Sequence, residues 1–313
     1  MSGEWKFVEK NDSLIPNIAH WSATSEGNEP YLIQVAWPLG WPALEQVVDI
    51  SQPTNVIYLV DGNAMFLSAT DIVRRNGLNR HQLGTIIVGI SYLMSDAVYS
   101  SRRGFDLTPP CENYTPPKDQ NGKSYPQPHG GADILLSFIN QVHRFLFNEI
   151  FQKVSVRQTA LFGHSYGALF ALHTLFTAPT SFDAYLAASP SIWWNDKFII
   201  EEENAFYQSS DVHHHPLVWM SYGSLEQTPE QQKDESADDF AKRRLSAAER
   251  RMADNCDEMY VCLKASERVG IMKKNVYEGE DHGSVIATSL SGSILFFIDN
   301  SRDSGEDCTE AEA

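Results

Sequence analysis

Short runs of apolar residues alternate with amphipathic stretches along most of this chain. The apolar runs are typical of strands that are buried on both faces of a sheet, and they predict strands at residues 31–37, 56–60, 85–90, 159–162, 184–188, 216–222 and 272–277. Apolar positions at helical spacing predict helices at 64–75, ending near Gly77, at 132–151, from 168 onward, at 238–265 and at 284–297. This alternation predicts a single-domain α/β fold, with a mostly parallel central sheet and helices on both faces.

Three segments do not follow the alternation. Residues 1–30 are polar and irregular, with one possible strand near Trp5–Val8. Residues 91–130 hold six of the fifteen prolines, and a loop of this length is usually functional or disordered. Its aromatic residues and its position after a strand favour a loop on the substrate side. Residues 299–313 are acidic and rich in small residues, so we expect a disordered tail after a domain that spans 1–298.

Composition and charge limit the possible partners. The chain has 41 acidic and 24 basic residues and a net charge of −17, so it should repel nucleic acid and anionic membrane surfaces. No run reaches transmembrane length and the first residues do not resemble a signal peptide, which predicts a cytoplasmic protein. The four cysteines show neither metal-ligand spacing nor a disulfide framework. Adjacent side chains on an extended chain point in different directions, so His213, His214 and His215 indicate a solvated turn, not a metal site. The oligomeric state stays open.

The sequence Gly163-His164-Ser165-Tyr166-Gly167 lies between a predicted strand and a predicted helix. This order is typical of the nucleophile elbow, in which a sharp turn exposes the serine Oγ. The two glycines allow strand and helix to approach each other, and the N–H of Tyr166 at the helix start can face a developing oxyanion. We therefore predict Ser165 as a catalytic nucleophile. The side chain of His164 should point away from the reactive face and pack structurally.

A serine hydroxyl needs an adjacent base near neutral pH. His282 follows the last predicted strand, which is the position of the base in this arrangement. The acid should follow the strand that ends near Tyr222, which makes Glu226 the first candidate. Glu280, Asp281 and Asp234 are alternatives, although adjacent side chains such as those of Asp281 and His282 rarely face each other.

The second donor to an oxyanion should come from the loop after the early buried strand. Asp61, Gly62 and Asn63 occupy that loop, and Gly62 permits close backbone approach. We predict the N–H of Gly62 or Asn63 as this donor, together with that of Tyr166. An ordinary strand-to-helix turn that Asp61 caps would have the same sequence, and both roles can coexist.

Six stretches in the same order resemble the esterase-D-like branch of the α/β-hydrolases, and within it the siderophore esterases related to enterobactin and salmochelin hydrolases. They are 58–63 (YLVDGN), 103–109 (RGFDLTP), 163–167 (GHSYG), 189–194 (SPSIWW), 223–226 (GSLE) and 281–283 (DHG). The resemblance covers roughly residues 30–298. It implies Ser165 as nucleophile, His282 as base, and an oxyanion hole near Gly62, Asn63 and Tyr166.

The resemblance also suggests substrate-binding residues. It implies that Arg103 lines the substrate cleft and that Trp193 and Trp194 flank a bulky ligand. The alternatives are that Arg103 forms a buried ion pair with Asp106 and that the tryptophans belong to the core. Some esterases of this kind work with a Ser–His pair and little help from an acid, which leaves the importance of Glu226 open.

The expected substrate follows from the family resemblance together with the net charge of the chain. Bacterial members hydrolyse catecholate siderophores whose ferric complexes are strongly anionic, and an acidic protein opposes such a ligand unless Arg102 and Arg103 compensate. The chain looks more like the intracellular fungal branch, which cleaves ester-linked hydroxamate siderophores such as fusarinine and triacetylfusarinine C. We therefore expect a serine esterase that acts on a small ferric siderophore. It would need no metal or organic cofactor, since iron would arrive with the substrate. The alternatives are a general carboxylesterase or thioesterase such as S-formylglutathione hydrolase, and a non-catalytic siderophore-binding protein.

Overall fold

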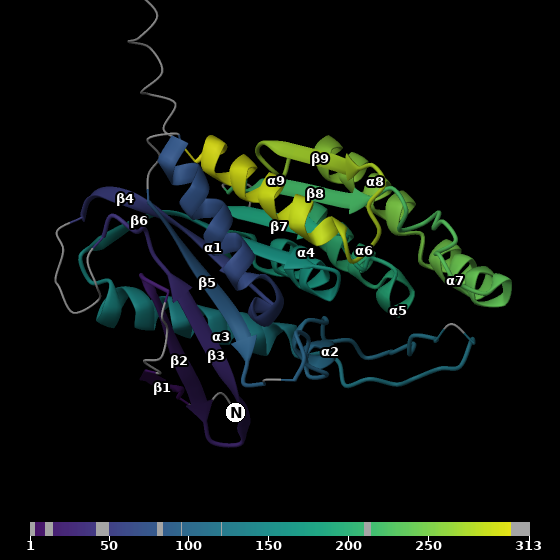
Figure 1. Cartoon of the computed structure of the whole chain (residues 1–313), viewed down its shortest axis with the longest axis horizontal. Helices are drawn as coiled ribbons and strands as arrows, with labels where there is room; N and C mark the ends of the chain where they lie inside the picture. Colours follow the sequence, from purple (N-terminus) through teal and green to yellow (C-terminus); the bar gives the residue numbers. More distant parts are fainter. Residues whose placement is uncertain are drawn as a thin grey trace, which may run out of the picture.

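A central sheet organises the protein in the computed structural model, which describes residues 4–9, 15–41, 50–79, 84–94, 96–119, 121–209 and 214–301. Within these residues the sheet has nine strands in the order β1-β2-β3-β5-β4-β6-β7-β8-β9 (Figure 1). The strands are β1 (Lys6–Glu9), β2 (Ile18–Ser25), β3 (Asn28–Ala36), β4 (Ile50–Leu59), β5 (Thr85–Tyr92), β6 (Val154–His164), β7 (Ala184–Ala188), β8 (Leu217–Gly223) and β9 (Met272–Tyr277).

The sheet is parallel from β5 to β9 and antiparallel at the β1–β3 end. Because parallel strands point the same way, the loops after β4, β6, β8 and β9 leave the sheet at one edge. In such sheets ligands bind at the carboxyl ends of the strands. The topology therefore brings the loops that hold the predicted site residues to one edge.

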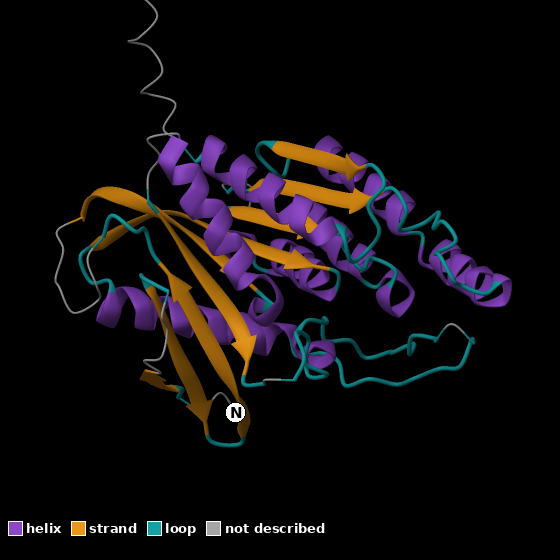
Figure 2. Cartoon of the chain, in the orientation of Figure 1, coloured by secondary structure: helices purple, strands orange, loops and turns teal. Residues whose placement is uncertain are grey.

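Helices cover both faces, as Figure 2 shows. One face packs against α1 (Gly62–Asn79) and α9 (Val285–Asn300). The other face packs against α3 (Ala132–Phe145), α4 (Tyr166–Thr177), α6 (Ile199–Gln208) and α8 (Met252–Ala265). Shorter elements are α2 (Arg103–Asp106), η1 (Leu146–Ile150), η2 (Pro179–Ser181) and α5 (Trp194–Lys197), and α7 (Ala237–Arg250) precedes α8. This confirms the predicted α/β fold.

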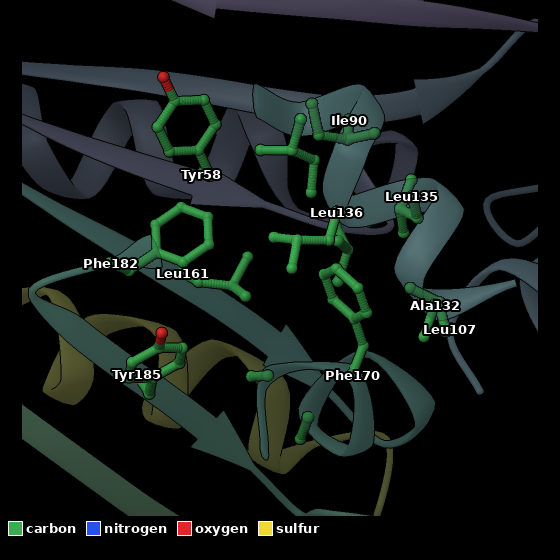
Figure 3. Close-up of a cluster of buried hydrophobic side chains, with 14 of the residues drawn as sticks. Tyr58, Ile90, Leu107, Ala132, Leu135, Leu136, Leu161, Phe170, Phe182 and Tyr185 are labelled. Atoms are coloured by element: carbon green, nitrogen blue, oxygen red, sulfur yellow. The ribbon is translucent and has the colours of Figure 1, made fainter. Parts of the chain in front are cut away.

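The core follows the period of two that a strand imposes. In β4, Tyr58 belongs to the core under α3 and α4, whereas its neighbours Ile57 and Leu59 belong to the core under α1 and α9. Figure 3 shows Tyr58 with Leu136 and Phe170, side chains of β4, α3 and α4, in one apolar cluster. Both faces of the strand are buried, which is why β4 reads as a continuous apolar run.

One buried polar group links three helices. His173 on α4 is 1% exposed; its Nδ1 lies 2.9 Å from Glu202 Oε2 on α6, and its Nε2 lies 3.0 Å from Asp133 Oδ1 on α3. Burial alone would lower the pKa of His173, but hydrogen bonds and charges from both carboxylates outweigh burial and raise this pKa to about 9. The imidazole is therefore protonated at neutral pH and ties the elbow helix to its neighbours.

Several predicted boundaries are wrong. The N-terminal segment is not irregular, because β2 pairs with β1 and β3. The predicted helix at 238–265 is two helices, because Arg251 has φ 48° and its left-handed backbone turns the chain. The predicted helix 132–151 ends in the π turn η1, and Gly77 lies inside α1. The predicted domain end at 298 falls within α9, and residues 302–313 of the predicted tail lie outside the described residues.

Candidate active site

The turn between β6 and α4 has the geometry of a nucleophile elbow. Ser165 has φ 60° and ψ −116°, a backbone conformation that is costly for a residue with a side chain. A Cβ on Gly163 would overlap the carbonyl of Gly167, and a Cβ on Gly167 would lie 2.8 Å from Val60 Cγ2. Only glycine fits at either position, so these two residues let the strand and the helix meet around Ser165.

Three predicted residues from different loops form a hydrogen-bonded chain. The Oγ of Ser165 lies 3.0 Å from Nε2 of His282, and Nδ1 of His282 lies 2.7 Å from Oε2 of Glu226. The Glu226 side chain is fully buried, whereas that of His282 is 45% exposed. This arrangement of serine, imidazole and buried carboxylate is the one that activates a serine hydroxyl in hydrolases.

Glu226 is held by donors on its other oxygen. Its Oε1 accepts hydrogen bonds from Ser189 Oγ at 2.6 Å and from the backbone N–H of Gly223 at 2.7 Å. Ser189 itself has φ 48° at the end of β7, and its N–H donates to the carbonyl of Ser221 at 2.7 Å. These hydrogen bonds fix the orientation of the Glu226 carboxylate.

The loop that carries His282 is tied to the loop of Glu226. The N–H of Leu225 donates to the carbonyl of Glu280 at 3.0 Å, and Gly223 lies so close to Glu280 that a Cβ there would overlap its backbone. Asp281 accepts from the N–H groups of Gly283 and Ser284, both at 2.8 Å; these bonds lower the pKa of Asp281. Among the carboxylates weighed from the sequence, Glu226 is therefore the one that contacts the imidazole, while Asp281 holds the turn.

The loop after β4 lies beside the elbow. Asp61 has φ 53°, and Gly62 and Asn63 form the first turn of α1. The Asn63 side chain donates to the carbonyl of Tyr92 at 2.9 Å and accepts from its N–H at 2.7 Å, which fixes this turn against β5. The first N–H groups of a helix have no acceptor within the helix. The starts of α1 and α4 thus offer backbone donors from both predicted oxyanion-hole loops.

The environment of Arg103 differs from both sequence interpretations. Its guanidinium binds both oxygens of Asp61, at 3.0 Å from Nε to Oδ1 and 2.8 Å from Nη2 to Oδ2, and it does not line the cleft. The expected pair with Asp106 is wrong, because Asp106 pairs with Arg102 at 3.0 Å. Arg103 therefore stabilises the loop after β4 by neutralising a carboxylate that is 1% exposed.

A cleft of about 700 Å³ opens over Ser165 and His282. Its walls include Asp119 and Asn121 of the long loop, Ser191 and Trp193 after β7, four residues after β8 (Leu225, Glu226, Pro229 and Gln232), the inner face of α7, and Asp281–Gly283 after β9. Trp193 lines this cleft. Trp194 does not, because it is 2% exposed and packs in the core, so the prediction that it flanks a ligand is wrong.

His164 packs behind the imidazole of His282. The two ring centroids lie 4.6 Å apart, and His164 is 4% exposed. Burial lowers the pKa of His164 well below its usual value, and the nearby His282 lowers it further. His164 is therefore a neutral packing residue, as its position in the motif predicted.

Two serines at the site were not singled out from the sequence. Ser189 holds Glu226, and Ser191 Oγ lies 3.3 Å from Ser165 Oγ with a residue exposure of 1%. Both belong to the stretch Ser189–Trp194 that carried part of the family resemblance, and that stretch was the signal for them. In the described part of the chain, no group of three His, Cys, Asp or Glu residues is arranged to hold a metal ion. His213 lies outside the described residues.

A nucleophile elbow, a serine–histidine–carboxylate chain and loops gathered at the carboxyl ends of parallel strands together define an α/β-hydrolase. The model of the Esterase family, described as "Putative esterase", matches residues 26–262, and this chain belongs to that family. It is a carboxylic-ester hydrolase.

Comparison with known proteins narrows the branch of the family. The chain is 46% identical over 296 residues to a siderophore enterobactin esterase of Emericella nidulans, covering 93% of this chain and 97% of that protein. It is 42% identical over 290 residues to a siderophore triacetylfusarinine C esterase of Aspergillus fumigatus, covering 91% and 94%. The solved structure of the siderophore hydrolase EstA from Aspergillus nidulans superposes with a TM-score of 0.89 at 45% identity, covering 96% of this chain and all of that one.

Proposed function

We propose that this protein hydrolyses ester bonds of an iron-loaded siderophore, with Ser165 as the nucleophile. The observation that carries the proposal is the chain of hydrogen bonds from Ser165 through His282 to Glu226 at the floor of a polar cleft. Relatives at 46% and 42% identity that are named as siderophore esterases supply the substrate class.

The geometry of the site suits each of its residues to one role in the reaction. Ser165 Oγ attacks the ester carbonyl carbon while its proton passes to Nε2 of His282. The negative charge on the carbonyl oxygen is stabilised by the N–H groups of Tyr166 and of Gly62 or Asn63. The C–O bond of the ester breaks, and His282 returns the proton to the leaving alkoxide.

An acyl-enzyme on Ser165 remains and is hydrolysed by water. His282 takes a proton from the water as the hydroxide attacks the acyl carbon, and then gives that proton to Ser165 Oγ as the acid leaves. Glu226 holds the imidazole in the tautomer with Nδ1 protonated and stabilises the imidazolium. None of these steps needs a resident cofactor. Cleavage of the remaining esters releases monomers, which bind iron more weakly because the chelating groups are no longer held in one connected ligand.

Charge favours a near-neutral ferric hydroxamate of the triacetylfusarinine C type as the substrate. Arg102 and Arg103 pair with buried carboxylates, so they do not supply free positive charge for a strongly anionic complex. The described residues that line the cleft include two arginines, Arg243 and Arg250, and two aspartates, Asp119 and Asp281. A further carboxylate, that of Glu226, faces His282. The net charge of −17 of the whole chain opposes a catecholate complex further. The 46% identity to an enterobactin esterase favours a catecholate instead, and it makes ferric enterobactin the second candidate substrate.

The free thiols fit a reducing compartment. Among the described residues, Cys111, Cys256 and Cys262 form no disulfide. Disulfides are rare in the cytoplasm, where thiols are kept reduced, and we place the reaction there. No helix among the described residues has the length and apolar character needed to cross a membrane.

The test is hydrolysis by the purified protein of ferric triacetylfusarinine C, ferric enterobactin, p-nitrophenyl acetate and S-formylglutathione, followed by mass spectrometry. Ser165→Ala is the blank for each substrate. We expect stepwise cleavage of ferric triacetylfusarinine C that the substitution abolishes and that is faster than with the other three. Faster cleavage of ferric enterobactin would transfer the assignment to catecholates. Turnover of p-nitrophenyl acetate or S-formylglutathione alone would refute the siderophore assignment. An intact fold with ligand binding but no turnover would indicate a binding protein.

A further inference from the structure

Helix α7 is unusual because the core does not hold it. None of its residues, Ala237 to Arg250, is buried, and Figure 1 shows the helix projecting at the end of the molecule toward which β8 and β9 run. A surface helix normally buries an apolar stripe at positions i, i+3, i+4 and i+7. In α7 the half-buried residues are Phe240, Arg243, Ser246, Ala247 and Arg250, and the last four of these line the cleft. The inner face of α7 is therefore adapted to a polar ligand.

The two arginines on the inner face of α7 have different partners. Arg243 forms a two-point ion pair with Glu235, at 2.7 and 2.8 Å, and donates to the carbonyl of Glu230 at 2.6 Å. No carboxylate among the described residues pairs with Arg250. Instead its guanidinium lies over the ring of Trp193, 4.7 Å from the centroid.

Stacking leaves the donors of Arg250 available. A guanidinium that lies over an aromatic face keeps its five N–H groups directed outward in its own plane. Trp193 in turn lies 6.1 Å from the ring of Tyr166, the residue that follows Ser165. Trp193 therefore lies between Tyr166 on one side and Arg250 on the other, in contact with both. Tyr166, Trp193 and Arg250 thus form one wall that leads from the elbow to α7.

We propose that Arg250, stacked on Trp193, is a specificity-determining residue that binds the iron-ligating oxygens of a ferric siderophore and so selects the iron-loaded form. This inference rests on the proposed function. The oxygens around Fe(III) in such a chelate carry negative charge and are held in a rigid array, which suits the fork of a guanidinium. In the iron-free ligand the same groups are protonated and mobile, so Arg250 gains little from contact with them.

The test is equilibrium binding by calorimetry in the Ser165→Ala background, so that no substrate is consumed. The ligands are ferric and iron-free triacetylfusarinine C. We expect Arg250→Gln to weaken binding of the ferric form about tenfold, or about 1.4 kcal/mol, and to change binding of the iron-free form less than about twofold. Arg250→Lys keeps the charge without the planar fork, so it should weaken ferric binding about threefold.

Arg244→Gln is the matched control. Arg244 lies on the same helix, is exposed and stacks on Phe240 instead of lining the cleft, and its loss changes the net charge from −17 to −18 as the loss of Arg250 does. We expect this variant to bind both ligands like the parent. Circular dichroism should be unchanged in each variant, because no residue of α7 is buried.

The possible failures are distinguishable. Equal weakening of ferric and iron-free binding by Arg250→Gln, an effect below twofold on both, or an equal effect of Arg244→Gln would each overturn the assignment of Arg250. Absence of binding by either ligand would overturn it as well. Failure of the proposed function shows separately, as binding without hydrolysis by the protein with intact Ser165 and His282.

Discussion

The substitution Glu226→Gln tests whether the buried carboxylate is part of the catalytic machinery or only fills space. The two oxygens of Glu226 have different partners. Oε1 accepts two hydrogen bonds, from Ser189 and Gly223, and Oε2 faces Nδ1 of His282 at 2.7 Å. In the glutamine variant the amide oxygen must occupy the Oε1 position, since both neighbours there are donors. The amide NH₂ group then points at His282.

The consequence is a wrong tautomer. An NH₂ group that faces Nδ1 requires Nδ1 to be an acceptor, so the proton of the neutral ring moves to Nε2. Nε2 can then no longer accept the proton of Ser165, from which it lies 3.0 Å away. The corresponding Asp→Asn change in a serine protease lowers kcat about 10⁴-fold, and four decades equal about 5.4 kcal/mol of transition-state stabilisation. We expect a loss of this order in Glu226→Gln.

The measurement is kcat for p-nitrophenyl acetate and for the siderophore, with thermal unfolding to show that the variant is folded. Glu280→Gln is the matched control, since it removes a carboxylate from the same loop cluster, whereas the imidazole nitrogens pair with Glu226 and Ser165; we expect less than a twofold change. A loss of less than about tenfold in Glu226→Gln, with Ser165→Ala and His282→Ala inactive, would refute this reasoning. The site would then work as a Ser–His pair.

Three further substitutions test contacts that hold the site and its neighbouring helices in place. Ser189→Ala removes one donor to the buried carboxylate and should lower kcat about tenfold, about 1.4 kcal/mol, with KM unchanged. Arg103→Met leaves Asp61 buried without its partner and should lower the free energy of unfolding by about 3 kcal/mol in urea denaturation, whereas Arg103→Lys should recover part of it. The raised pKa of His173, about 9 against 6.5 in the unfolded chain, gives stability that is complete below pH 6.5 and is lost as the pH rises through 9. The difference in free energy of unfolding between the parent and His173→Ala should therefore shrink by about 3 kcal/mol between pH 6 and pH 10; a constant difference would contradict it.

The strands were predictable where a strand is apolar on both faces and a turn residue ends it. The predicted and observed limits of β7 and β9 coincide because Ser189-Pro190 and Glu278-Gly279 stop these runs. β2 was missed because small and polar residues such as Ala19, Ser22 and Ala23 fill its buried positions, so no apolar run marks it. The break at Arg251 was missed because arginine gives no signal for a left-handed backbone, which glycine or asparagine would have given.

In the active site, too, some features were predictable from the sequence and others were not. Ser165 and His282 were found because elbow glycines and chain order restrict where they can lie, and Glu226 because it is the first carboxylate after β8. The partner of Arg103 could not be found, since Asp61 and Asp106 are both acceptable by charge and only the packing of α2 beside the loop after β4 decides between them. Local sequence specifies the reacting groups, whereas the contacts that hold them depend on which loops the sheet brings together.

The difference between what the sequence specifies and what only the fold shows also applies to the choice of substrate. A net charge of −17 acts over distances of about a Debye length and opposes any anionic ligand on approach, whatever the cleft contains. The arginines that the sequence offered for compensation, Arg102 and Arg103, lie outside the cleft lining and are already neutralised by carboxylates. Among the described residues that line the cleft, the arginine without a carboxylate partner is Arg250, which a helix outside the core presents over Trp193. One unpaired guanidinium suits a chelate that is close to neutral overall but carries charge on its iron-bound oxygens. It is too little to offset a strongly anionic complex, so the charges of the cleft and of the whole chain favour the same class of substrate.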